Sequence, residues 1–274
     1  MSATKSLAFV LHTQDYRDTS LLGDFYTKDF GRIRGIVKGI RDTRARFGST
    51  LEPFSLNEIL FYRRRRGAEL HLVTQVDLLD LFPVLRDDLE RLATASYCSE
   101  LLKELVENEE SAPEIFELMH DTLKFLVSGA SAKRAARIFE VKLFDLLGLM
   151  PEVKNCVFCR TEAKGIFYFN AGLGGVHCGD CGSKGKLGAR HVAASANPRF
   201  SAGQGSGRHE TSAPISLGTL HFLSHVQRAA ISDLYSVKVS QEVGEELEKV
   251  LRRFTDFHLS HKLNSLTFME KIGL

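Results

Sequence analysis

The hydrophobic and polar positions of the chain change their period once, near residue 82. Before that point, short runs rich in β-branched and aromatic residues alternate with clusters of Gly, Asp, Ser and Arg, a pattern typical of strands joined by turns. The pattern predicts five strands, over residues 6–13, 20–27, 32–40, 54–62 and 69–76. Five short strands in a segment of this length favour a small closed β-barrel.

Beyond residue 82 the apolar residues recur at spacings of three and four, as they do along one face of an α-helix. A capping-box spacing, Ser-Ala-Pro-Glu at residues 111–114, indicates a helix start there. The periodicity predicts helices over about residues 85–105, from about 111, over about 131–147, from near 217, and over about 243–259.

These elements predict an α+β protein of two domains, a β-barrel over residues 1–80 and a helical domain over residues 81–274. Residues 183–214 are rich in Gly, Ser and Ala and poor in large apolar residues, which predicts a flexible linker. The length of 274 residues suffices to bury a core, and 43% hydrophobic and 26% charged residues are ordinary for a globular protein.

The sequence predicts no membrane-spanning segment, and we expect no secretory leader. No stretch approaches the roughly 18 uncharged apolar residues that cross a bilayer, and the first residues lead into an alternating segment rather than an apolar one. We therefore expect a cytoplasmic protein.

Four of the five cysteines form two C-x-x-C pairs, Cys156 with Cys159 and Cys178 with Cys181, eighteen residues apart. Cysteines this sparse do not make a disulfide scaffold, and the spacing is that of a four-cysteine zinc site. Four thiolates close the coordination shell, so we expect one structural Zn²⁺ in an insertion at about residues 155–182. Two redox-active dithiols are the alternative, and the neighbouring His177 is not needed as a ligand.

Positive charge is concentrated in residues 32–66, which hold ten Lys or Arg against three acidic residues. Period two places Ile33, Gly35 and Val37 on one face of the third strand, and on the other it places the cations Arg32, Arg34 and Lys38 with one apolar residue, Ile36. Such a face, with an aromatic ring nearby, suits single-stranded nucleic acid, because cations hold phosphates and planar groups stack on bases. The predicted contacts are Arg32, Arg34, Lys38, Arg41, Arg44 and Arg46.

Two further groups of residues have a functional and a simpler interpretation. The turn of Arg63, Arg64, Arg65 and Arg66 is a further candidate contact with nucleic acid, or only a charged hairpin tip. Cations at the start of a helix oppose its dipole, so the cluster at residues 133–137 either faces an acidic partner or is merely solvated. Its members are Lys133, Arg134 and Arg137.

No motif for catalysis is visible. The sequence lacks a phosphate loop, a G-x-S-x-G elbow and an H-E-x-x-H pair. We therefore expect a binding protein rather than an enzyme.

The order of these parts resembles the RecO family of bacterial recombination mediators. The likeness extends over nearly the whole chain and is carried by residues 7–17, by Phe-Gly-Arg-Ile-Arg-Gly at 30–35, by Leu-Glu-Pro-Phe at 51–54 and by His-Lys-Leu-Asn-Ser-Leu at 261–266. The resemblance implies that the barrel is an OB-fold and that the basic barrel residues bind DNA. It also implies that zinc supports the fold.

The resemblance further implies a role in DNA repair and recombination. The family binds single- and double-stranded DNA, anneals complementary strands, and contacts RecR and single-stranded-DNA-binding protein to help load RecA, in association with the nucleoid. The cations at residues 133–137 are candidates for the acidic tail of single-stranded-DNA-binding protein. A zinc-knuckle adaptor for nucleic acid, or a zinc or dithiol enzyme acting on nucleic acid, is the alternative.

Overall fold

The computed structural model describes residues 3–16, 20–38, 51–63, 70–183, 212–234, 237–259 and 261–273. The chain divides into two compact units, the first made of Met1–Ala136 with Leu263–Leu274 and the second of Arg137–Lys262. The first unit thus combines a barrel with helices. The domain boundary at residue 80 stays a prediction.

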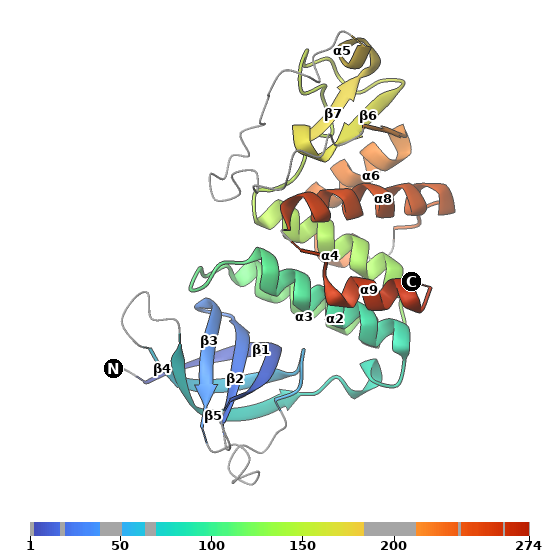
Figure 1. The fold of residues 1–274 in the computed structure, drawn as a ribbon. Coiled ribbons are helices and arrows are strands. Elements are labelled where there is room, and N and C mark those ends of the chain that lie inside the picture. The colour runs from blue at the N-terminus through green and yellow to red at the C-terminus, as the bar shows by residue number, and fades with distance from the viewer. Residues whose placement is uncertain are drawn as a thin grey trace. The chain divides into compact units, whose positions relative to one another are not determined.

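Unit 1 begins with a closed five-stranded barrel of order β1-β2-β3-β5-β4, drawn from blue to teal in Figure 1. All neighbouring strands are antiparallel except β3 and β5, which run parallel. The five predicted strands are confirmed, with the bounds β1 (Ala3–Tyr16), β2 (Ser20–Thr27), β3 (Gly31–Val37), β4 (Leu56–Tyr62) and β5 (His71–Asp80).

Alternate residues of each strand fill the barrel interior. On β3 the predicted inward residues Ile33, Gly35 and Val37 are buried, whereas the alternate positions are partly or fully exposed. The interior cluster consists of Ala8, Val10, Phe25, Ile33, Val37, Leu51, Ile59, Phe61, Val73 and Val76. The period-two analysis of this strand is therefore confirmed.

A short connection, η1 (Pro83–Leu85), leads to helix α2 (Leu89–Leu105), which the Asp88 side chain caps by accepting from the backbone N–H groups of Glu90 and Arg91. Helix α3 (Pro113–Val127) follows, and α4 (Ala132–Leu146) contains the boundary between the units. The capping box expected at residues 111–114 is wrong. The N-cap of α3 is Ala112, which has no side chain that can cap.

Helix α9 (Asn264–Lys271) lies beside α2, although the two are far apart in the sequence (Figure 1). Its N-cap, Leu263, offers no side-chain oxygen, and Glu100 of α2 takes that role. The Glu100 carboxylate accepts from the backbone N–H of Asn264 at 3.1 Å and from the backbone N–H and hydroxyl of Ser265 at 2.8 and 2.5 Å. A carboxylate at a helix N-terminus satisfies free N–H groups and favours the helix dipole.

Unit 2 contains a small three-stranded sheet of order β7-β6-β8 and several helices. Phe169 of the sheet contacts Phe254, whose ring lies 4.9 Å from that of Phe144 on α4. The elements are β6 (Phe167–Asn170), η2 (Ala171–Leu173), β7 (Gly175–Cys178), α5 (Gly179–Ser183), β8 (Ala213–Ile215), α6 (Leu217–Arg228), α7 (Ile231–Leu234) and α8 (Gln241–His258).

The sheet was not expected from the sequence, and β8 begins within the predicted linker at residues 183–214. Residues 184–211 of that linker lie outside the described residues. No helix among the described residues combines the length and apolar character that crossing a membrane requires.

Candidate nucleic-acid interface and metal site

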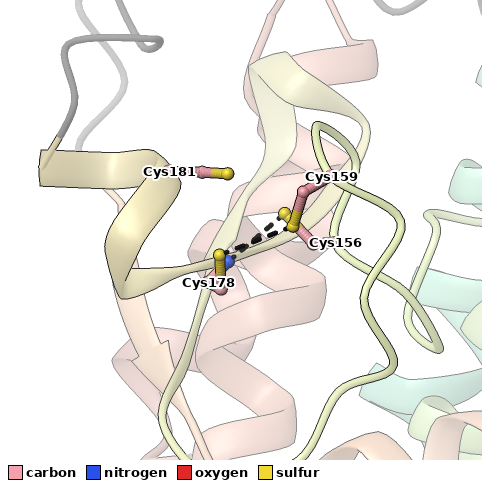
Figure 2. Close-up of side chains that lie close together, drawn as sticks. All are labelled: Cys156, Cys159, Cys178 and Cys181. Atoms are coloured by element: carbon pink, nitrogen blue, oxygen red, sulfur yellow. Dashed lines mark hydrogen bonds between the residues drawn. The ribbon is translucent and has the colours of Figure 1, made fainter.

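The two C-x-x-C pairs converge in unit 2 (Figure 2). Cys156 and Cys159 lie on a turn before β6, Cys178 ends β7, and Cys181 lies in α5. Their four sulfur atoms all lie within 4.8 Å of one another. The spacing in the sequence therefore predicted a cluster that the fold assembles.

The arrangement of the sulfurs fits a tetrahedral metal ion. With metal–sulfur bonds of about 2.3 Å, the edge of a zinc–sulfur tetrahedron is about 3.8 Å, and the Sγ atoms of Cys159 and Cys178 lie 3.8 Å apart. A disulfide would need about 2.05 Å, and all four cysteines are free thiols. The backbone N–H of Cys178 also points to the sulfur of Cys156 at 3.5 Å, a contact that stabilises a thiolate. The cluster can hold one divalent ion through sulfur alone.

The surroundings of the four thiols differ. Hydrogen bonding with Thr161 lowers the pKa of the exposed Cys159 to about 6, while burial raises the pKa of Cys181 to about 12. Of these two thiols, it is therefore the buried one that metal binding has to deprotonate at neutral pH.

His177 lies beside the cluster but is engaged elsewhere. Its Nε2 lies 2.9 Å from the Ser212 hydroxyl, its Nδ1 lies 3.1 Å from the carbonyl oxygen of Cys178, and its ring stacks on Tyr168 at 5.5 Å. These contacts use both ring nitrogens, so the imidazole supports the knuckle rather than adding a ligand.

The outward side chains of the barrel form rows across β1, β2 and β3, because residues paired across strands point to the same side. The first row, which we call the docked row, consists of Phe9, Tyr26 and Arg32. The helices of unit 1 cover it. The ring of Phe9 lies 4.8 Å from that of Phe116, and the Tyr26 hydroxyl donates to the carbonyl of Ala112 at 3.1 Å.

Arg32 belongs to this docked row and is held by the end of α2. Its Nη1 donates to the carbonyls of Lys103 at 2.5 Å and Val106 at 3.2 Å, and its Nη2 lies 3.4 Å from Asp24. A guanidinium at a helix C-terminus satisfies free carbonyls and the negative end of the dipole. With a side chain only 20% exposed, Arg32 makes contacts within the fold that favour a structural role over the predicted nucleic-acid contact.

The backbone at Arg32 and Gly31 also contacts the segment that follows α2. The Arg32 carbonyl accepts from the N–H of Glu109 at 2.7 Å. Gly31 has a positive φ of 65°, and a Cβ there would lie 1.9 Å from the carbonyl oxygen of Glu110. The motif at residues 30–35 therefore contains a close backbone approach between the barrel and residues 108–110.

The second row consists of His12, Asp24 and Arg34. Asp24 is buried, and both His12 and Arg34 reach it at 4.0 Å. The side chain of Arg34 is 44% exposed, so this guanidinium remains accessible at the border between the covered and the open parts of the barrel wall.

The third row, the apolar row, lies on the open part of the wall. It consists of the cross-strand neighbours Leu22, Ile36, Leu72 and Tyr62, all half-buried. The exposed Lys38 follows β3 on its far side. Sequence analysis noted Ile36 but missed its three neighbours, because their alignment depends on strand register. The open wall therefore combines apolar and aromatic surface with a cation on each side.

The other predicted cations are divided between contacts within the fold and undescribed residues. Arg63 contacts Glu109 at 3.2 Å and lies over the Phe30 ring at 5.1 Å, with 42% of its side chain exposed. The remaining predicted contacts lie outside the described residues: Arg41, Arg44, Arg46, Arg64, Arg65 and Arg66.

The three cations of α4 differ in exposure. Lys133 is exposed and Arg134 half-buried. Arg137 is 8% exposed, and its Nη1 donates to both carboxylate oxygens of Glu140, at 2.8 and 2.9 Å. The Glu140 carboxylate therefore already engages the Arg137 guanidinium within the fold, and Arg137 as a contact for an acidic partner stays a prediction that these contacts do not favour.

Comparison with protein families covers both halves of the chain. A family model described as "Recombination protein O N terminal" matches residues 1–82. A second, described as "Recombination protein O C terminal", matches residues 86–197 and 176–267. Together the two matches extend over the barrel, the helices and the cysteine cluster.

Individual relatives match over almost their full length. The DNA repair protein RecO of Anaeromyxobacter sp. (strain K) is 30% identical over 274 residues, which cover 100% of this chain and 98% of the relative. The proteins of the same name from Pelotomaculum thermopropionicum and Syntrophus aciditrophicus are 29% and 28% identical, over 100% and 98% of this chain and 96% and 95% of the relatives.

Proposed function

The chain belongs to the recombination protein O family of DNA repair proteins, and on that premise we propose that it is a non-enzymatic recombination mediator. In this proposal it binds single- and double-stranded DNA and anneals complementary strands. It acts with RecR, in the cytoplasm at the nucleoid, to help load RecA onto DNA coated by single-stranded-DNA-binding protein.

The observation that carries the proposal is the open wall of the barrel. Arg34 and Lys38 flank Ile36 on β3, and the apolar row continues from Ile36 to the ring of Tyr62. Single-stranded DNA requires both kinds of group, because cations neutralise phosphates and aromatic or apolar faces support bases. The proposed contacts are Arg34, Lys38 and Arg63, with the arginines at residues 41–46 and 64–66 joining them.

The four cysteines support a structural metal rather than a catalytic one. We propose that Cys156, Cys159, Cys178 and Cys181 hold one Zn²⁺, which would tie α5 to the turn before β6. Four thiolates leave no coordination position for water or substrate, which weighs against the alternative of a zinc enzyme acting on nucleic acid.

A second contact would serve the acidic tail of single-stranded-DNA-binding protein. Lys133 and Arg134 remain candidates, since both lie in the first turn of α4 and neither is fully buried.

Fluorescence anisotropy of a labelled single-stranded oligonucleotide tests the proposed interface. Wild type is compared with the double variant Arg34→Glu/Lys38→Glu at several salt concentrations. If about five phosphates are neutralised, the log–log salt slope of wild type is about −3.5, and the loss of two contacts reduces it to about −2.

The matched control is Lys238→Glu/Lys271→Glu, which makes the same change of charge at two exposed lysines outside the barrel. It should leave the slope near that of wild type. Equal effects of the two double variants would show that overall charge, and not the barrel wall, governs binding, and would overturn the proposed interface.

A further inference from the structure

The four cysteines of the cluster are not equally accessible. Cys156 is 0% exposed and Cys181 is 4% exposed, whereas Cys159 is exposed and Cys178 is half-buried. The two more accessible cysteines come one from each C-x-x-C pair. Figure 2 shows them facing one another, with Sγ atoms 3.8 Å apart.

The buried sulfurs are protected by position. The sulfur of Cys156 receives the backbone N–H of Cys178 at 3.5 Å, and Cys181 lies on α5 with its side chain turned inward. Cys159 instead lies at the end of the turn, next to Arg160, whose side chain is 73% exposed. A small oxidant from solvent therefore meets Cys159 first and Cys178 second.

We infer that Cys159 and Cys178 form a peroxide-sensitive pair whose oxidation releases the metal. The inference rests on the proposed zinc site. The inference is specific in that the disulfide joins the two C-x-x-C pairs. A disulfide within either pair would instead join one accessible and one buried cysteine.

The chemistry balances with hydrogen peroxide as the only oxidant. The Cys159 thiolate attacks one peroxide oxygen and breaks the O–O bond, giving a sulfenic acid and hydroxide. The Cys178 thiolate then attacks the sulfenic sulfur and displaces a second hydroxide, which forms the disulfide. Two thiolates lose two electrons and peroxide gains them, which would leave only Cys156 and Cys181 to hold a zinc ion.

The experiment uses the purified full chain. Elemental analysis first measures zinc, and a chain without zinc would refute the zinc site itself. The zinc-loaded protein is then titrated with peroxide while a metallochromic dye records release, and disulfides and alkylated thiols are mapped by mass spectrometry. The expected result is one zinc released per Cys159–Cys178 disulfide, with reductant and added zinc restoring the starting state.

Two variants sharpen the result. Cys159→His keeps a zinc-ligating side chain but removes the first thiol, so its zinc should resist peroxide. Cys98→Ala removes a buried cysteine outside the cluster and should release zinc as wild type does. A disulfide between Cys156 and Cys159 or between Cys178 and Cys181, or modification of a buried cysteine first, would overturn the inference. Because the disulfides are mapped on the wild-type protein, this result decides the inference whether or not Cys159→His folds.

Discussion

Replacing Arg32 should destabilise unit 1 without removing the proposed DNA-binding surface. The Arg32 guanidinium donates to two carbonyls at the end of α2 and lies 3.4 Å from the buried Asp24. Hydrogen bonds that involve a charged group contribute about 1.5–3 kcal/mol each. Allowing for the 20% exposure of the side chain, we expect Arg32→Ala to lower the free energy of unfolding by about 3 kcal/mol.

Arg34→Ala is the matched variant, two residues along the same strand face. Its guanidinium is 44% exposed and reaches Asp24 only at 4.0 Å, so its loss should change stability by less than about 0.5 kcal/mol. The two variants should therefore affect different properties. Arg32→Ala weakens the fold, and Arg34→Ala weakens the affinity for DNA.

Hydrogen exchange measured by mass spectrometry reports on the affected region directly. Peptides that cover residues 100–110 should lose protection by roughly 100-fold in Arg32→Ala, the factor that corresponds to about 3 kcal/mol, and should be unchanged in Arg34→Ala. Oligonucleotide anisotropy at a temperature where both variants are folded supplies the second measurement. Normal protection together with lost DNA affinity in Arg32→Ala would refute the assignment of Arg32 to the fold.

Three other predictions concern stability. Gly31→Ala should lower the melting temperature steeply, because its Cβ would lie 1.9 Å from the carbonyl oxygen of Glu110. Gly244→Ala on α8, where the Cβ meets open space, should instead stabilise the protein by about 0.5–1 kcal/mol. Thermal melts in which the two variants shift the melting temperature equally would contradict this. Burial lowers the pKa of His258 to about 4, so the folded state binds fewer protons than the unfolded state between about pH 4 and 6.5. The free energy of unfolding should therefore rise with pH across that range. Denaturant titrations at several pH values should show a flatter rise for His258→Phe. Burial acts to raise the pKa of Glu100, but the hydrogen bonds from α9 outweigh burial and the pKa is lowered. The stability that the Glu100 carboxylate contributes is therefore lost as the pH falls from the ordinary pKa of a glutamate through the lowered one. Unfolding followed by circular dichroism should show that Glu100→Gln loses less stability in acid than wild type does.

The sequence was most informative where a feature depends on local periodicity or spacing. The five strands followed from alternation and turn residues, and α4 and α8 followed from apolar positions three and four apart. The cysteine cluster followed from the spacing of two C-x-x-C pairs. In each case the residues that specify the feature lie close together in the chain.

Features that depend on tertiary contacts were not predictable in this way. Arg32 and Arg34 occupy equivalent positions on one strand face, and only the end of α2 distinguishes them. The edge strand β8 pairs with β6 across more than 40 intervening residues, so its three residues carried no readable strand pattern. The burial of Arg137 had a local signal, because Glu140 follows it at the i, i+3 spacing.

The N-terminus of α6 repeats an arrangement seen at α9. Glu246 of α8 accepts from the backbone N–H of Ser216 at 3.0 Å and from its hydroxyl at 2.6 Å, and it also accepts from the hydroxyl of Thr219. In both units, then, a carboxylate from one helix caps another that is distant in sequence. Such caps join two helices through directional hydrogen bonds in addition to side-chain packing. A search of the sequence for capping boxes does not find them, because the capping residue belongs to another helix.

The discontinuity of unit 1 has a consequence for synthesis of the protein on the ribosome. The barrel and α2 emerge early, but α9, which lies against α2, is translated only after the whole of unit 2. Ser265, which donates to Glu100, lies 165 residues further along the chain. The whole of unit 2 is therefore synthesised before this contact can form. At about 5–20 residues per second, the surface of α2 that α9 covers stays open for roughly 8–30 seconds. For that interval α2 lacks the helix that packs against it in the folded protein, so the time needed to translate unit 2 sets the earliest moment at which unit 1 can be completed.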